Sequence, residues 1–165
     1  MKGMGKFDRA SLIELKREPK RLEAAVFSPM RKKLPAPLDK VPQARREATA
    51  MIPVAEDLKA VFIAKSGDVR EKKAITGFLF REQDGRLTPL VRMDLHLSHK
   101  DLHIHINCED ERDLTGRSGL PGCKEFALDR FAISGFDPDR EEDRQRFIGA
   151  FCDVCNIALG RGDLF

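Results

Sequence analysis

From Leu58 onward, hydrophobic and polar residues alternate with the period of two that is typical of β-strands with one buried face. Clusters rich in glycine or aspartate separate most of these segments, and such clusters favour turns. Asp84-Gly85 is the clearest turn signal, because this pair suits a two-residue hairpin. The strands that the pattern predicts are residues 58–66, 74–82, 86–97, 102–109 and 124–133.

The spacing becomes helical near the C-terminus. Acidic residues come first, and apolar residues then recur three or four positions apart from Phe147 onward. We therefore expect an amphipathic helix within residues 138–159 that packs one face on the sheet. Cys152 and Cys155 have the spacing of a zinc-binding pair, but both fall on the apolar face of this helix, so we expect reduced core cysteines.

The N-terminal third is predicted to form a helical arm. Ser11 and Glu14 make a capping box at the start of a short helix, and a helical pattern continues through residues 20–29. Residues 34–42 contain three prolines, which favour an extended connector. A further short helix is expected around residues 43–51.

These elements predict an α+β fold with a helical basic N-terminal arm, an antiparallel sheet of about five strands, and a C-terminal amphipathic helix packed on one sheet face. The expected division places the basic helical arm and its proline-rich connector in residues 1–57. The sheet and the C-terminal helix then occupy residues 58–165.

Charge is unevenly distributed along the chain, although the net value is only +3. Residues 1–50 carry 13 Lys and Arg against 6 Asp and Glu, whereas residues 101–165 carry 8 against 14. A basic segment suits contact with a phosphate backbone. A solvated face that docks on the acidic half of the same chain also explains these charges.

Composition narrows the possible chemistry. The 165 residues include 11 Phe but no Tyr and no Trp, so any mechanism lacks a tyrosine nucleophile and the two largest base-stacking side chains. No apolar run approaches the ~18 residues of a membrane span, and the first residues lack the apolar core of a signal peptide. We therefore expect a cytoplasmic protein with no membrane partner.

All four histidines fall between residues 96 and 105, around one predicted turn. With a four-residue loop at 98–101, Leu97 lies opposite Leu102 and the polar side chains of both strands share one face. The expected facing pairs are His96 with His103, Asp94 with His105, and Arg92 with Asn107.

The upstream hairpin adds a third strand to this polar face. It places Gly77 opposite Arg92, where the missing side chain leaves room for a ligand, and it supplies Arg81 as a further contact. Phe78 and Phe80 are expected to join Val91 on the opposite, core-facing side. We call the predicted polar surface, which consists of Arg92, Asp94, His96, His103, His105 and Asn107 over Gly77, the histidine patch.

The histidine patch suits two kinds of chemistry. In the first, histidines exchange protons with RNA while Asp94 orients a ring and Arg92 holds a phosphoryl oxygen, without a metal. In the second, His103 and His105 chelate a divalent metal, and His96 or Asp94 supplies the third ligand. A hydrated polar face without specific function is the remaining alternative. The candidate catalytic residues are His103, His105, Asp94, Arg92 and His96.

Residues 115–122 form a glycine-rich stretch without the Lys-Ser/Thr ending of a Walker loop. We expect a surface loop there, with nearby arginines able to touch a phosphate over the histidine patch. The candidate substrate-binding residues are Asn107, Gly77, Arg81, Arg112 and Arg117.

His103-Ile-His105 resembles the His-hydrophobe-His pair of rolling-circle and relaxase nucleases. In that family the pair binds a metal while a tyrosine attacks DNA, and the absence of tyrosine from this chain excludes such a step.

A broader resemblance covers about residues 75–160. Their order of motifs is similar to that of an uncharacterised family of small bacterial and phage-borne proteins, and toxins of toxin–antitoxin pairs share parts of it. The resemblance implies a mobile-element or toxin-like role. The matching segments are Arg92-x-Asp94, His103-x-His105 and Cys155-Asn-Ile157.

The sequence therefore favours a small nucleic-acid-directed protein, with a toxin-like ribonuclease as the first expectation. RNA and a cognate antitoxin are the expected partners, and no cofactor is expected unless the divalent-metal alternative holds. The other function class is a non-enzymatic interaction protein, such as an antitoxin, an immunity protein or a phage regulatory factor, that binds a protein partner.

Overall fold

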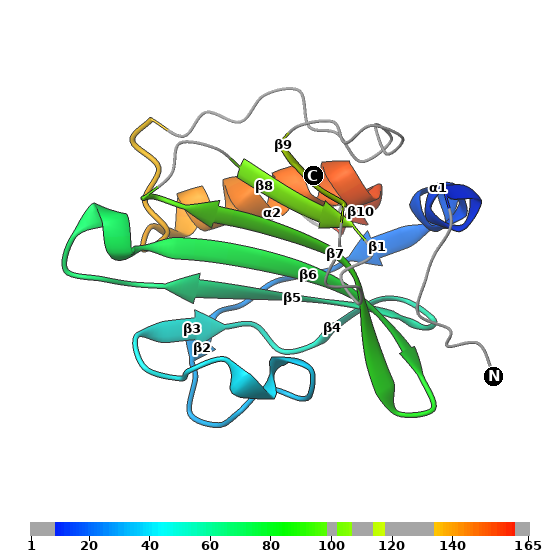
Figure 1. Ribbon diagram of the computed structural model, residues 1–165, viewed down its shortest axis with the longest axis horizontal. Coiled ribbons are helices and arrows are strands. Elements are labelled where there is room, and N and C mark those ends of the chain that lie inside the picture. The colour runs from blue at the N-terminus through cyan, green and yellow to red at the C-terminus, as the bar shows by residue number, and fades with distance from the viewer. Residues whose placement is uncertain (1–8, 99–101, 107–113, 118–133, 161–165) are drawn as a thin grey trace.

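The computed structural model describes residues 9–98, 102–106, 114–117 and 134–160 (Figure 1). Its N-terminal elements are α1 (Arg9–Arg17), β1 (Lys20–Leu22), β2 (Ser28–Pro29), the 3₁₀ helix η1 (Leu38–Lys40), β3 (Arg46–Ala48) and β4 (Ile52–Ala55). The central elements are β5 (Leu58–Lys65), the 3₁₀ helix η2 (Arg70–Lys72), β6 (Ala74–Gln83), β7 (Arg86–His96), β8 (Leu102–Ile106) and β9 (Leu114–Arg117). The last elements are α2 (Glu141–Cys155) and β10 (Ile157–Leu159).

The main sheet is antiparallel, with the strand order β2-β3-β5-β6-β7-β8-β9, and β4 also pairs with β5. Helix α2 covers one face of this sheet, while β1 and β10 form a separate parallel pair (Figure 1). The α+β class, the antiparallel sheet and the C-terminal helix are thus confirmed, with more strands than the five predicted. The predicted strand at 124–133 lies outside the described residues. No helix in the described part of the chain has the length and hydrophobicity needed to cross a membrane.

The prediction of a helical N-terminal arm is wrong. Helix α1 does form, but the regions predicted as further helices contain β1, β2 and β3, and β3 pairs directly with β5. The physical reason is tertiary: the face of β5 opposite α2 carries Val61 and Ile63, which the N-terminal segment buries. Covering this apolar surface outweighs local helical propensity, which is weak in segments interrupted by proline.

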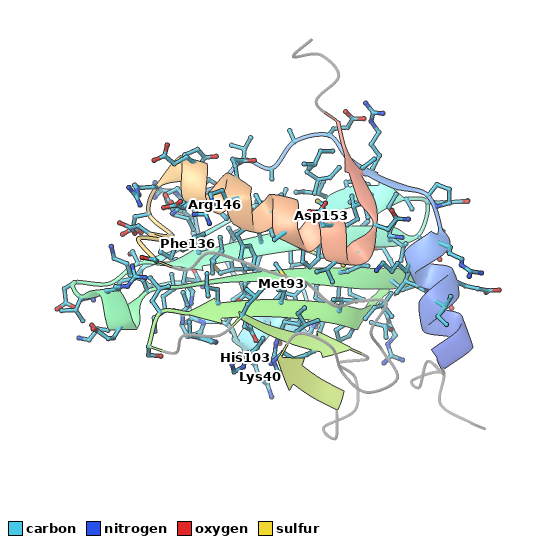
Figure 2. The ribbon with its side chains drawn as sticks, turned by 90° about the horizontal axis from the view of Figure 1, so that it is seen from above. Lys40, Met93, His103, Phe136, Arg146 and Asp153 are labelled. Atoms are coloured by element: carbon cyan, nitrogen blue, oxygen red, sulfur yellow. The ribbon has the colours of Figure 1, made fainter. Side chains whose placement is uncertain are left out.

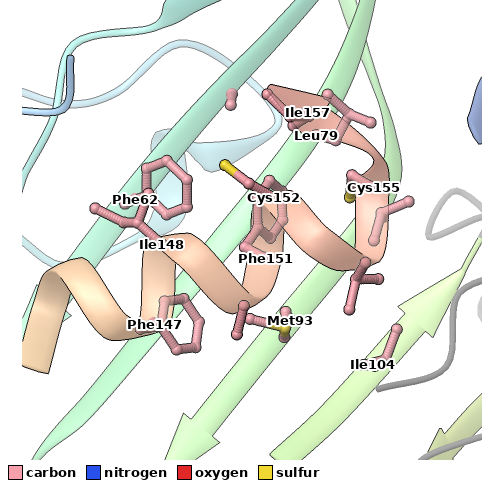
Figure 3. Packing of buried hydrophobic residues seen from close by; sticks show 14 of the residues in the cluster. Phe62, Leu79, Met93, Ile104, Phe147, Ile148, Phe151, Cys152, Cys155 and Ile157 are labelled. Carbon is pink, nitrogen blue, oxygen red and sulfur yellow. The ribbon is translucent and has the colours of Figure 1, made fainter. Parts of the chain in front are cut away.

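The helix-side core lies between α2 and the sheet (Figure 3). Phe62 of β5 and Phe151 of α2 meet edge to face, with ring centroids 5.1 Å apart and planes at 81°. Cys152 and Cys155 are free thiols buried in this core, as predicted, and burial raises the pKa of the Cys152 thiol to about 12. Both cysteines therefore act as small apolar side chains that hold α2 on the sheet.

A second core covers the opposite face of the sheet. Its buried residues are contributed by η1, β3, β5 and β6, and Phe78 packs against them. Phe78 and Phe80 thus lie on the face away from α2, and their predicted position on the same side as Val91 is wrong. The buried members of this second core are Leu38, Ala48, Val61, Ile63 and Phe80.

A β-bulge in the β6–β7 hairpin explains this correction. Near the turn the pairing is as predicted, with Arg81 opposite Thr88, and Asp84 and Gly85 have the positive φ angles (52° and 75°) of a two-residue hairpin turn. The register then shifts between Leu79 and Phe80, so every later pair moves by one position. A shift of one position exchanges the two faces of a strand.

Candidate functional site

The bulge and the β7–β8 ladder bring polar side chains together on the sheet face away from α2. Arg92 pairs with His105, and Asp94 pairs with His103. The predicted partners were two positions away, because Leu95, and not Leu97, lies opposite Leu102. A shift of two positions keeps each side chain on its face. His103 accordingly lies on the side of the sheet opposite α2 (Figure 2).

Arg92, Asp94 and His105 form the Arg-Asp-His cluster. Arg92 Nε donates to Asp94 Oδ2 over 2.8 Å, and Arg92 Nη2 lies 2.9 Å from His105 Nε2. His105 Nε2 is also 3.2 Å from Asp94 Oδ2. All three groups therefore meet within hydrogen-bond distance on two adjacent strands.

Asp94 is a buried carboxylate, with 7% of its surface exposed. Burial by itself raises the pKa of this carboxyl group, because it disfavours the charged form. The hydrogen bond with His105 and the positive charge of Arg92 outweigh that effect, and a hydrogen bond with Thr76 adds to them. The pKa of Asp94 consequently lies below its ordinary value, so the cluster keeps a negative charge inside the protein.

His105 Nε2 faces both a permanent donor and a carboxylate acceptor. When Nε2 carries no proton it accepts a hydrogen bond from Arg92, and when it carries one it donates to Asp94. Gain or loss of one proton thus exchanges the partner of the ring. This geometry suits an imidazole that moves protons, because both states have a hydrogen-bond partner in place.

The other described histidines lie beside the cluster on the same face. The His103 ring is 6.5 Å from the His105 ring, centroid to centroid, with the planes tilted by 46°. His96, at the end of β7, is exposed and pairs with Ala74 of β6. Neighbouring histidines of this kind can divide the roles of proton donor and proton acceptor.

A cavity of about 570 Å³ opens on this sheet face and reaches Arg92, Asp94 and His96. We call it the basic cavity, because most of the charged residues that line it in the described part of the chain are cationic. The cationic side chains that line it are Arg46, Lys65, Lys72, Lys73 and Arg92, and the anionic ones are Glu71 and Asp94. Its remaining lining residues are Val41, Pro42, Ile63, Ala74, Thr76, Phe78, His96 and Ser98.

Two predicted substrate-binding residues lie away from this site. Gly77 is on the helix side, where an added Cβ would lie 2.9 Å from Phe62 Cε1 and 3.0 Å from Phe151 Cδ2. Its expected role as an opening beside Arg92 is wrong, because the bulge turns it toward α2. Arg81 has a structural ion pair instead, with Nη1 2.6 Å from an oxygen of Asp57.

The structure describes only one of the three remaining predicted substrate-binding residues. Arg117 pairs with His103 in the β8–β9 ladder, which places its backbone beside the cluster. Asn107 and Arg112 lie outside the described residues. Sequence reasoning missed Lys65, Thr76 and Phe78, which line the basic cavity. Alternation along β5 and β6 could have placed these three residues on one face of the sheet. That Arg92 lies on the same face follows only from the bulge in the β6–β7 pairing.

The metal alternative has no complete ligand set in the described part of the chain. Among residues 9–98, 102–106, 114–117 and 134–160, no three His, Cys, Asp or Glu side chains are grouped as a metal site. His96 pairs across the sheet with Ala74, whereas His103 is opposite Asp94.

Comparisons with protein-family models, curated proteins and solved structures find no match to this chain.

Proposed function

We propose that this protein is a small RNA-directed enzyme, a ribonuclease of toxin-like character whose reaction takes place at the Arg-Asp-His cluster. The observation that carries the proposal is the meeting of Arg92, Asp94 and His105 within 3.2 Å at the edge of the basic cavity. An arginine, a buried carboxylate and an imidazole supply charge neutralisation, orientation and proton transfer, which metal-independent phosphodiester cleavage requires.

In this reaction one histidine takes the proton of the ribose 2′-hydroxyl. The 2′-oxygen then forms a bond to phosphorus, the bond from phosphorus to the 5′-oxygen breaks, and a second, protonated histidine gives its proton to the leaving 5′-oxygen. His105 and the adjacent His103 provide the two rings. Asp94 orients His105, and Arg92 has further N–H groups with which to hold a phosphoryl oxygen.

The test is cleavage of a single-stranded RNA oligonucleotide by the purified full chain. We expect a product with a 2′,3′-cyclic phosphate, and a loss of rate of about 10²-fold or more in His105→Ala and in Arg92→Ala. Arg86→Ala is the matched control, because Arg86 is an exposed arginine at the opposite end of the same strand. Circular dichroism establishes that each variant is folded.

Three results would count against the proposal. They are the absence of cleavage by the wild-type chain, full activity of His105→Ala, and a rate lost on addition of a chelator. The last result would favour the metal alternative at His103 and His105. The first would favour the non-enzymatic alternative, in which the chain binds a protein partner.

A further inference from the structure

The basic cavity has features that the cleavage step does not use. Besides Arg92 and Asp94, its lining includes the aromatic side chain of Phe78 and the cationic side chains of Lys65 and Arg46. We propose that the cavity binds one nucleotide of single-stranded RNA, with the base against Phe78 and a phosphate against Lys65 and Arg46. This inference rests on the proposed RNA-directed function and extends it to the form of the substrate.

Strand register places the two cations next to each other. Arg46 pairs with Lys65 across β3 and β5, and Lys65 pairs with Ala74 of β6. Neighbouring strands are ~4.8 Å apart, so both cationic side chains can reach a single phosphate. The small side chain of Ala74 leaves space in front of them.

The other cations of the cavity are already engaged. Lys73 Nζ lies 3.1 and 3.0 Å from oxygens of two aspartates that precede α2, and Lys72 is 3.3 Å from a third aspartate. Arg46 donates to a main-chain carbonyl at 3.1 Å and keeps further N–H groups. Among the described residues, Lys65 has no ion-pair partner. The anion position is therefore expected at Lys65 and Arg46.

Phe78 is half-buried and lines the cavity. Its ring stacks on that of Phe80, with centroids 5.4 Å apart and planes at 14°, and Phe80 does not line the cavity. We infer that the ring face turned away from Phe80 is the one available to a base. Val41 and Pro42 add an apolar wall from the N-terminal segment. Stacking of a base on an aromatic ring works for every base, so this arrangement predicts weak discrimination among nucleotides.

The size and position of the cavity suit one nucleotide beside the reacting group. A volume of about 570 Å³ is that of an ordinary small-ligand site, which is too small for a duplex. Lys65 pairs with Ala74, which pairs with His96 at the end of β7, so Lys65 and Arg92 are two strands apart and four positions apart along the strands, or ~17 Å between backbones. Phe78 pairs with Arg92 across β6 and β7, so a base on Phe78 lies beside the reacting group.

The test is a titration of the full chain with 5′-AMP, with binding measured by calorimetry or NMR. We expect binding that weakens with salt, and an affinity about tenfold lower in Lys65→Ala and in Phe78→Leu. Lys59→Ala is the matched control and is expected to bind like wild type. Lys59 lies on the same strand and face as Lys65 but is paired with Glu82 at 2.8 Å.

Absence of AMP binding would overturn the inference. So would inorganic phosphate that binds as tightly as AMP with no effect of Phe78→Leu, because the cavity would then recognise an anion alone. Equal affinity of Lys65→Ala and wild type would overturn the phosphate position, and this variant changes only a half-buried surface side chain. Titration requires no cleavage, so a failure here is distinguishable from a failure of the ribonuclease proposal.

Discussion

Asp94 is held ionised in a buried position by Arg92 and His105. Its pKa is lowered in the folded protein, so the ionised carboxylate stabilises the fold at every pH above its ordinary, unfolded value. This contribution is lost as the pH falls from about 4 through the lower pKa of the folded state. The charge at the site and the stability of the sheet are thus linked through one residue.

We expect Asp94→Asn to lower the free energy of unfolding at pH 7 by about 1–3 kcal/mol, because Arg92 loses its charged partner. The difference from wild type should shrink below pH 4, where the wild-type carboxylate takes up its proton. Urea unfolding at pH 7 and pH 3 measures both quantities. Asp84→Asn is the control, since Asp84 is an exposed turn residue and Asn-Gly suits the same turn. Equal destabilisation at both pH values would contradict the assignment.

At the scale of elements, α2 and β6 approach each other so closely that only glycine fits at position 77. An added Cβ there would lie 2.9 Å from Phe62 Cε1 and 3.0 Å from Phe151 Cδ2, which is closer than non-bonded carbon atoms normally approach. At Gly149, within α2 itself, an added Cβ would have no atom within 4 Å. The two glycines therefore give opposite predictions.

Gly77→Ala should lower the free energy of unfolding by about 1–3 kcal/mol through overpacking. Gly149→Ala should raise it by about 0.5–1 kcal/mol, because alanine favours the helix. Urea denaturation of both variants provides the comparison. A neutral Gly77→Ala would show that the residue does not face the helix-side core. A loss of RNA cleavage in the folded Gly77→Ala protein would indicate that Gly77 lies on the functional face of the sheet.

On the scale of the whole molecule, the basic N-terminal segment is part of the sheet and of the second core. Leu38 and Ala48 bury Val61, Ile63 and Phe80, and Val41 and Pro42 wall the basic cavity. The structure therefore joins the basic third of the chain to the candidate site. Removing this segment would remove packing as well as charge.

We expect deletion of residues 1–50 to abolish cooperative unfolding, measured by circular dichroism during heating. Each large apolar side chain that it exposes or removes costs about 1.5–3 kcal/mol, and a typical domain is stable by only about 5–15 kcal/mol. The control neutralises Arg31, Lys32 and Lys33 together to Gln. These residues are exposed, so the fold should persist. A deleted chain that still unfolds cooperatively would show that the segment is a dispensable arm.

The predictions that hold rest on the period of the hydrophobic pattern, which reports how a segment meets a core. Four of the strands from Leu58 to Ile106 and the C-terminal helix were visible in this way. The same alternation placed His103 and His105 on one face, and a register error of two positions left that face unchanged. The period of the hydrophobic pattern and the face on which a side chain lies within its own strand are local properties of a chain, so they can be inferred from its residues alone.

Only the tertiary structure decided which strands share that face and what surrounds it. The bulge near Leu79 depends on packing against two cores, and it moved Gly77 away from Arg92 and brought Phe78 beside it. The strands of the N-terminal segment form because β5 offers an apolar surface and unpaired backbone groups, neither of which is local to that segment. The sequence by itself determined the polar face with its histidines. The basic cavity next to Asp94 exists only because distant segments close around it.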